Sequence, residues 1–226
     1  MLLLFSSLAL AADPVDLGVL KNSDLKVVQR RLYTQEDRLE LGAHLALMPF
    51  DLITFTPALQ ITGGYHLSES VAIEGRLGGG YGFRTAFYNA LEVDGTLPEA
   101  YRYLASVDAN FLWTPVYGKI ALFGKKIIHS DLYLSAGAGM TLQQALIPSD
   151  NLATGDGTDP AAYLITPSAT FPIALGSHFF LSENAALRLE LRDSLLIEHR
   201  IQTDSTWFRQ GLQVSAGISF YGKKKG

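Results

Sequence analysis

Residues 187–192 read Leu-Arg-Leu-Glu-Leu-Arg, so apolar and charged side chains alternate one by one. Successive side chains of a β-strand point to opposite faces, whereas a helix repeats its apolar face every three or four residues. The period of two therefore predicts a strand with one apolar and one charged face. A second segment repeats the pattern, with Val107, Ala109, Phe111 and Trp113 alternating with Ser106, Asp108 and Asn110.

Eight segments carry this alternation, and we expect eight antiparallel strands. They span about residues 38–47, 54–67, 71–83, 103–113, 131–142, 163–181, 185–197 and 207–221. Short turns at one end and longer loops, about 84–102 and 143–162, at the other are the pattern of outer-membrane barrels. The connection at 114–130, which could contain a short strand at 119–123, breaks this asymmetry.

Alternation alone does not say which face is outside, because a soluble secreted barrel alternates equally well. Eight strands would place roughly thirty large apolar side chains on one face, too many for a lumen that side chains only just fill. Glycines share the charged face, which suits a crowded interior. We therefore predict an all-β, eight-stranded antiparallel transmembrane β-barrel, an up-and-down meander in the bacterial outer membrane. Six aromatic residues are expected in its interfacial girdles: Tyr65, Tyr103, Trp113, Trp207, Phe220 and Tyr221.

The charged face then becomes a lumen with matched acids and arginines. Charges that face a narrow interior must pair or stay hydrated. The sequence thus predicts an ion-paired plug rather than an open pore. The expected lumen charge network comprises Arg38, Glu40, Glu74, Arg76, Asp108, Asp131, Arg188, Glu190, Arg192 and Arg209.

Composition excludes several classes of protein. The mean hydropathy is +0.16, yet no apolar run after the start approaches the ~18 residues of a transmembrane helix. A net charge of −4 argues against nucleic-acid binding. The chain has no cysteine, so disulfides and thiolate metal sites are absent.

The first residues, 1–11, resemble the end of a signal peptide. Ala9-Leu10-Ala11 fits an A-x-A cleavage site, which places the mature start near Ala12. The basic start of such a leader is missing, so we expect the true start to lie upstream; a buried first strand is the alternative. The remaining divisions are a periplasmic segment at 12–37, the barrel at 38–221 and a basic tail at 222–226.

The sequence carries no pattern that assigns a catalytic, cofactor or metal site. Neighbours in the run His129-Ser130-Asp131 would point opposite ways on a strand and cannot form a relay. His199 beside Glu198 at the outer rim lacks a positioned serine. The aspartates of the second long loop miss the EF-hand spacing.

Three stretches carry a resemblance to a known family: 27–33 leading into 38–41, then 115–119, then 131–139. On these the chain resembles the outer membrane β-barrel domain proteins of myxobacteria and their relatives. Gly217–Tyr221 also resembles the C-terminal assembly signal of outer-membrane proteins, although five residues follow it. The family resemblance implies a structural anchor, in some members associated with gliding-motility machinery, and no catalytic residues.

The functional expectation is a non-enzymatic anchor or scaffold in the bacterial outer membrane. Its partners would be the lipid bilayer and envelope proteins, contacted through 13–37 and the loops 84–102 and 143–162. A small-solute channel and a lipid-modifying barrel enzyme are the alternatives.

Overall fold

The computed structural model describes residues 33–48, 54–93, 100–122, 126–146, 165–200 and 204–223. All of them belong to one compact unit, Leu32–Gly226. The predicted leader at 1–11 and the segment 12–32 lie outside the described residues.

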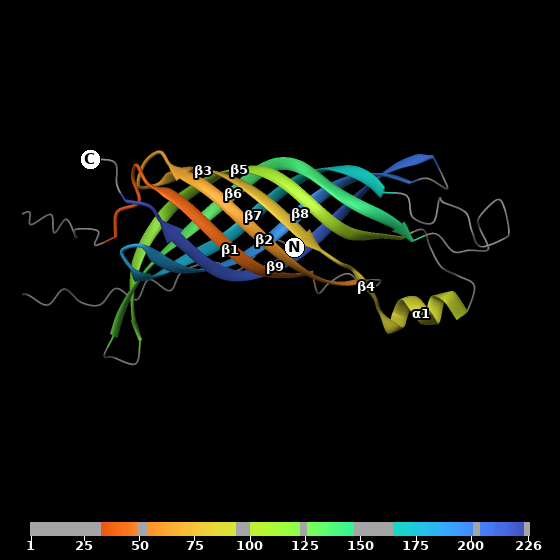
Figure 1. The fold of residues 1–226 in the computed structure, drawn as a ribbon, viewed down its shortest axis with the longest axis horizontal. Coiled ribbons are helices and arrows are strands. Elements are labelled where there is room, and N and C mark those ends of the chain that lie inside the picture. The colour runs from red at the N-terminus through yellow and green to blue at the C-terminus, as the bar shows by residue number, and fades with distance from the viewer. Residues whose placement is uncertain are drawn as a thin grey trace, which may run out of the picture. The chain divides into compact units, whose positions relative to one another are not determined.

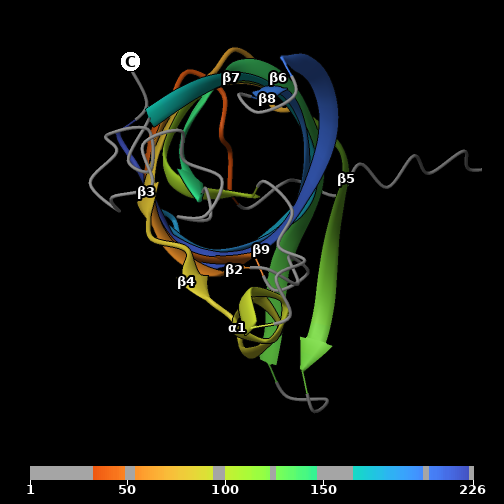
Figure 2. The same cartoon turned by 90° about the vertical axis from the view of Figure 1, so that its right-hand side faces the viewer.

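Eight long strands close into one ring (Figure 2). They are β1 (Leu39–Met48), β2 (Thr54–His66), β3 (Val71–Gly80), β5 (Ala100–Leu122), β6 (Lys126–Leu146), β7 (Ile165–Ser182), β8 (Ala185–Arg200) and β9 (Ser205–Tyr221). Each pairs antiparallel with the next along the chain, and β1 also pairs with β9. Closure leaves no open sheet edge in the ring, which is what a lipid environment requires. The predicted eight-stranded meander is confirmed.

The strands tilt across the ring axis, and its two ends differ (Figure 1). We call the end with the turns at 67–70 and 183–184 the turn end; the chain enters β1 and leaves β9 there. The opposite end is the loop end. It carries the two-residue strand β4 (Phe83–Arg84), which pairs with β2, and the helix α1 (Ala86–Val93). Within the described ranges, no helix is long and apolar enough to cross a membrane.

The predicted loop boundaries at the loop end are wrong. The stretch 84–102 contains α1 and the first residues of β5, and β6 continues to Leu146 rather than ending at 142. The β5–β6 ladder reaches the pair Ala100 and Leu146. The alternation fades here because Arg102 and Gln144 occupy outward positions, where the Arg102 Nε donates to the Gln144 Oε1 at 2.9 Å. The backbones of β5 and β6 therefore stay paired beyond the point where apolar side chains stop alternating with polar ones.

The connection predicted at 114–130 is instead a continuation of β5 and β6. Their pairing runs out to Leu122 and Lys126, interrupted by a bulge between Trp113 and Val116. Pro115 lies in this bulge, where a missing N–H does little harm to the ladder. The neighbouring strands stop earlier, so the hairpin projects beyond the ring at the turn end (Figures 1 and 2).

The faces have the predicted orientation. Leu41 and Leu45 of β1 are 65 % and 71 % exposed, whereas Arg76 and Arg188 are 2 % and 1 % exposed. An apolar exterior around a charged interior is the arrangement of a transmembrane barrel. The interior is crowded as well: a Cβ on Gly176 would lie 2.2 Å from the Tyr133 ring, which the glycine accommodates.

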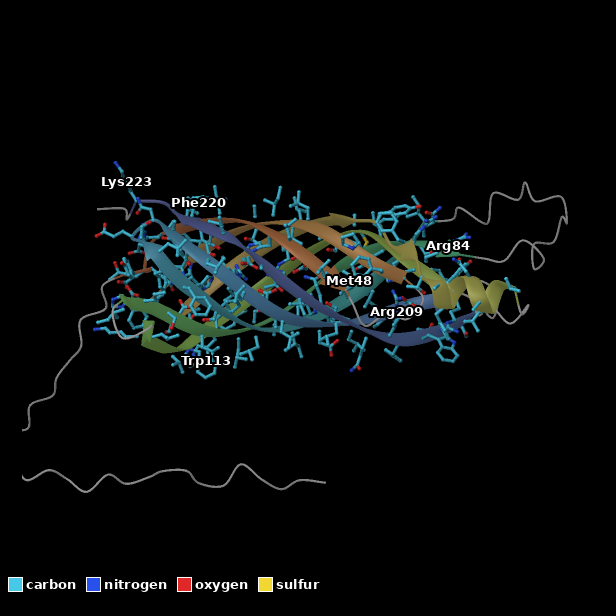
Figure 3. The ribbon with its side chains drawn as sticks, turned by 90° about the horizontal axis from the view of Figure 1, so that it is seen from below. Met48, Arg84, Trp113, Arg209, Phe220 and Lys223 are labelled. Atoms are coloured by element: carbon cyan, nitrogen blue, oxygen red, sulfur yellow. The ribbon has the colours of Figure 1, made fainter. Side chains whose placement is uncertain are left out.

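The predicted aromatic girdles are correct in part. Trp113, Trp207 and Phe220 are exposed, and Figure 3 shows Trp113 and Phe220 on the outer surface toward the turn end, with Arg84 near the loop end. Tyr103 and Tyr221 are buried and face the lumen instead. A bulge between Tyr103 and Ala105 reverses the alternation in β5. Tyr221 shares the inward register of Ser219.

Candidate functional site

The centre of the lumen is crossed by an ion-pair network from β3 to β8. These two strands lie on opposite sides of the eight-stranded ring. Arg76 of β3 holds Glu190 of β8 with both terminal nitrogens, at 2.7 Å and 2.9 Å. In return, the Arg188 Nη1 of β8 donates to the Glu74 Oε2 of β3. Two reciprocal bridges therefore span the diameter of the barrel.

Each of the four residues also bonds its near neighbour on the same face. The Arg76 Nη2 lies 2.9 Å from the Glu74 Oε1, and the Arg188 Nη2 lies 2.8 Å from the Glu190 Oε2. Side chains two residues apart on a strand share a face, so the period that defines the strand also pairs its charges. Tyr133 completes the cluster, since its hydroxyl donates to Glu190 and accepts from the Arg188 Nε, both at 2.6 Å.

The network continues toward the loop end through Arg192. Its Nε lies 3.1 Å from the Glu190 Oε1, and its Nη1 lies 3.0 Å from the Asp108 Oδ1. Arg209 lies further along and pairs with Glu198, with 2.7 Å between the Arg209 Nε and the Glu198 Oε1. Glu198 was predicted at the outer rim, beyond the strand at 185–197, but β8 runs to Arg200 and the alternation turns Glu198 inward.

Toward the turn end, a histidine joins two carboxylates. The His178 Nδ1 lies 2.8 Å from the Asp131 Oδ1, and its Nε2 lies 3.4 Å from the Glu40 Oε1. His66 contacts the second oxygen of Glu40 at 2.8 Å. The Arg188 Nη1 lies 3.5 Å from the Glu40 Oε1, which links this group to the central network.

His178 is a lumen-facing partner for carboxylates that the predicted set did not contain. With Glu198 included, six acids face the lumen, and four of the five predicted arginines bond them. A carboxylate can only accept a hydrogen bond, and both ring nitrogens of His178 face carboxylates, an arrangement that suits the charged imidazolium. His178 was not among the predicted lumen residues, although its even position on β7, against the exposed Ile173 and Leu175, indicates that it faces inward.

Residues 33–38 form a strap that covers the turn end. The Gln35 Nε2 donates to the Asp131 Oδ2 at 2.9 Å, and Tyr33 stacks on Phe180 with 5.4 Å between ring centroids. The backbone N–H groups of Gln35 and Glu36 donate to Glu69 in the 67–70 turn. The strap thus bonds both the lumen and the rim.

The structure places one predicted member, Arg38, outside the acid network. Its guanidinium donates to the Gly222 carbonyl and to the Asn184 Oδ1, each at 2.7 Å. Arg38 directly precedes β1 and lies at the level where β9 ends. Its guanidinium is therefore next to the backbone carbonyls of Tyr221 and Gly222 rather than next to the lumen acids. The remaining predicted residues run in one line of contacts from Asp131 to Asp108, with Arg209 paired separately at the loop end.

The residues considered for catalysis do not form a relay. His199 is exposed and contacts Asp204 at 3.2 Å, whereas Glu198 beside it turns into the lumen. The His129 Nδ1 bonds the Tyr117 hydroxyl at 2.9 Å, while Asp131 bonds His178. In the part of the chain that the structure describes, no group of three or more acids and histidines is arranged to hold a metal ion.

Fold and lumen together define a transmembrane β-barrel of the outer-membrane type. The N-terminal β-barrel domain of Pseudomonas aeruginosa OprF is similar, with a TM-score of 0.50 and 11 % identity over 83 % of this chain and 98 % of that one. Neisserial surface protein A (NspA) is similar with a TM-score of 0.52 and 10 % identity over 81 % and 95 %. At such identities the likeness shows the fold, which is that of bacterial outer-membrane barrels as predicted. No protein-family model and no curated relative matches the sequence.

Arg188→Met should destabilise the barrel strongly. The change leaves Glu74 and Glu190 short of a buried partner, and breaking such a pair costs about 3–5 kcal/mol. Urea unfolding in lipid vesicles measures the loss of free energy. Lys223→Met, at an exposed position past β9, is the control and should stay within about 0.5 kcal/mol of the parent protein. A loss below about 1 kcal/mol for Arg188→Met would show that the network does not hold the barrel together.

Proposed function

We propose that this protein is a non-enzymatic structural barrel of the bacterial outer membrane, which anchors an envelope-spanning complex of the gliding-motility kind. The carrying observation is the pair of reciprocal bridges between β3 and β8 across the lumen. A lumen crossed by bonded side chains makes a stiff barrel and a poor conduit. Rigidity is what an anchor needs.

Two further features support a role in attachment. The strap at 33–38 is bonded to the turn end through Gln35, Glu69 and Asp131. The β5–β6 hairpin projects from the same end and exposes Val116, Ile120 and Ile127. Exposed apolar residues outside a lipid-covered band are typical of contact surfaces for other proteins. With the turn end in the periplasm, both features would face envelope partners there.

The segment 13–37 and the stretches 84–102 and 143–162 are the proposed partner surfaces. Deleting residues 21–33 from the full chain should abolish co-purification of periplasmic partners after cross-linking, while the barrel still assembles. Removal of residues 224–226 from the other chain end is the matched control and should change nothing. Unchanged capture of partners by the 21–33 deletion would exclude this segment as the binding surface.

The channel alternative makes the opposite prediction for conductance. A lumen crossed by the Arg76–Glu190 and Arg188–Glu74 bridges should give no sustained single-channel current in planar bilayers. A combined Glu74→Ala, Arg76→Ala variant removes one half of both bridges without a net change of charge, and should conduct if it assembles. Steady ion-selective steps from the unaltered protein would favour the channel over the anchor.

A further inference from the structure

The loop-end half of the lumen holds a cavity of about 610 Å³. This volume lies in the range of small-molecule sites in proteins. Its floor, where it meets the charge network, includes Gln60, Asp108, Arg192 and Gln213. Toward the mouth, the lining is mixed: apolar side chains, including Met48, Leu196 and two residues of α1, lie among polar ones such as Thr54, Thr56 and Arg209.

The floor presents a buried amide N–H that lacks an acceptor. The Arg76 Nη1 donates to the Gln60 Oε1 at 3.1 Å, and the Gln60 Nε2 donates to the Gln213 Oε1 at 3.2 Å. An arginine can only donate, so it fixes the orientation of both amides in turn. The chain therefore ends on the Gln213 Nε2, which is buried and unpartnered.

Arg192 supplies a second unpartnered donor. Its Nε and Nη1 are engaged by Glu190 and Asp108, while its Nη2 is buried without a partner. The Asp108 Oδ1 accepts from both Arg192 and Asn110, so the floor carboxylate is already held. Asp193 also borders the cavity, from an outward register position opposite Ile173. Unsatisfied buried donors cost free energy, and an acceptor that carries negative charge satisfies them best.

The mouth of the cavity suits a hydrocarbon chain. Phe87 and Leu91 are four residues apart on α1, so they lie on one face of the helix. Both line the cavity, together with Leu196, which is buried at an inward position of β8. Free donors at the floor and these three apolar side chains nearer the mouth together suit an amphiphile.

We propose that this cavity binds a small anionic amphiphile with a carboxylate or phosphate-monoester head. The oxyanion accepts from the Arg192 Nη2 and the Gln213 Nε2, and a short alkyl tail packs against Phe87, Leu91 and Leu196. This role goes beyond anchoring: the turn end and the hairpin take no part in it, and only α1, within the proposed partner surface 84–102, belongs to both.

Calorimetric titration of the full chain in lipid nanodiscs tests the site, with the heat of empty nanodiscs subtracted. The probes are octanoate, octyl phosphate and 1-octanol, which share a tail and differ in the head. At least one acid should bind about tenfold more tightly than 1-octanol, because donors at the floor recognise charge. The acid that binds identifies the head group. Equal binding of all three, or no binding of either acid, overturns the proposal.

Two variants locate the binding. Gln213→Leu removes the free amide and should weaken binding of the acid about tenfold, whereas Gln144→Leu, at an outward position, should leave it unchanged. Phe87→Ala on exposed α1 leaves the barrel wall intact. It should weaken binding of whichever octyl acid binds, without altering the response to the short analogue with the same head, acetate or methyl phosphate. Unaltered affinity for that octyl acid in Phe87→Ala would overturn the proposed tail position, whether or not Gln213→Leu folds.

Discussion

Charged side chains enclosed in a narrow, lipid-covered barrel must pair with one another. The exterior of this barrel is apolar, so its charged residues occupy the interior. There the free energy of burying an ion is offset only by a well-placed partner. Arg76, Glu74, Arg188 and Glu190 meet this requirement by reaching across the full diameter from β3 to β8. Opposite walls of the ring are thereby joined by side chains as well as by the sheet.

The rest of the interior is organised around this central crossing. On the turn-end side, His178 joins Glu40 to Asp131, and the strap at 33–38 closes the rim through Gln35. On the loop-end side, the network ends at Arg192 and Gln213, where buried donors remain without acceptors at the floor of the cavity. The two halves of one lumen thus differ in character. The turn-end half is crossed by bonded side chains and contacted by the strap, and the loop-end half encloses the cavity.

The fold class could be predicted from the sequence: period-two alternation in segments such as 187–192 indicates the strands, and the number of large apolar side chains indicates which face is outside. The charged members of the lumen also follow from alternation, as Arg188, Glu190 and Arg192 show. Features that interrupt the alternation could not be predicted. A bulge after Tyr103 turns that ring inward. Polar outward residues such as Gln144 interrupt the apolar alternation, so the last residues of β6 could not be recognised as strand. The ion pairs across the lumen could not be predicted either. They depend on the relative height of strands that are not neighbours in the sheet, such as β3 and β8.

The orientation of the two faces is the claim on which the lumen, the anchor and the cavity all depend. The chain has no cysteine, so single cysteines on β9 can carry spin labels without further changes. In lipid vesicles, labels at Val214, Ala216 and Ile218 should collide freely with oxygen dissolved in the bilayer, while labels at Gln213 and Ser215 should be shielded. Such alternation along one strand would match an apolar exterior. Shielded labels at the first three positions, with those at Gln213 and Ser215 open to oxygen, would contradict it.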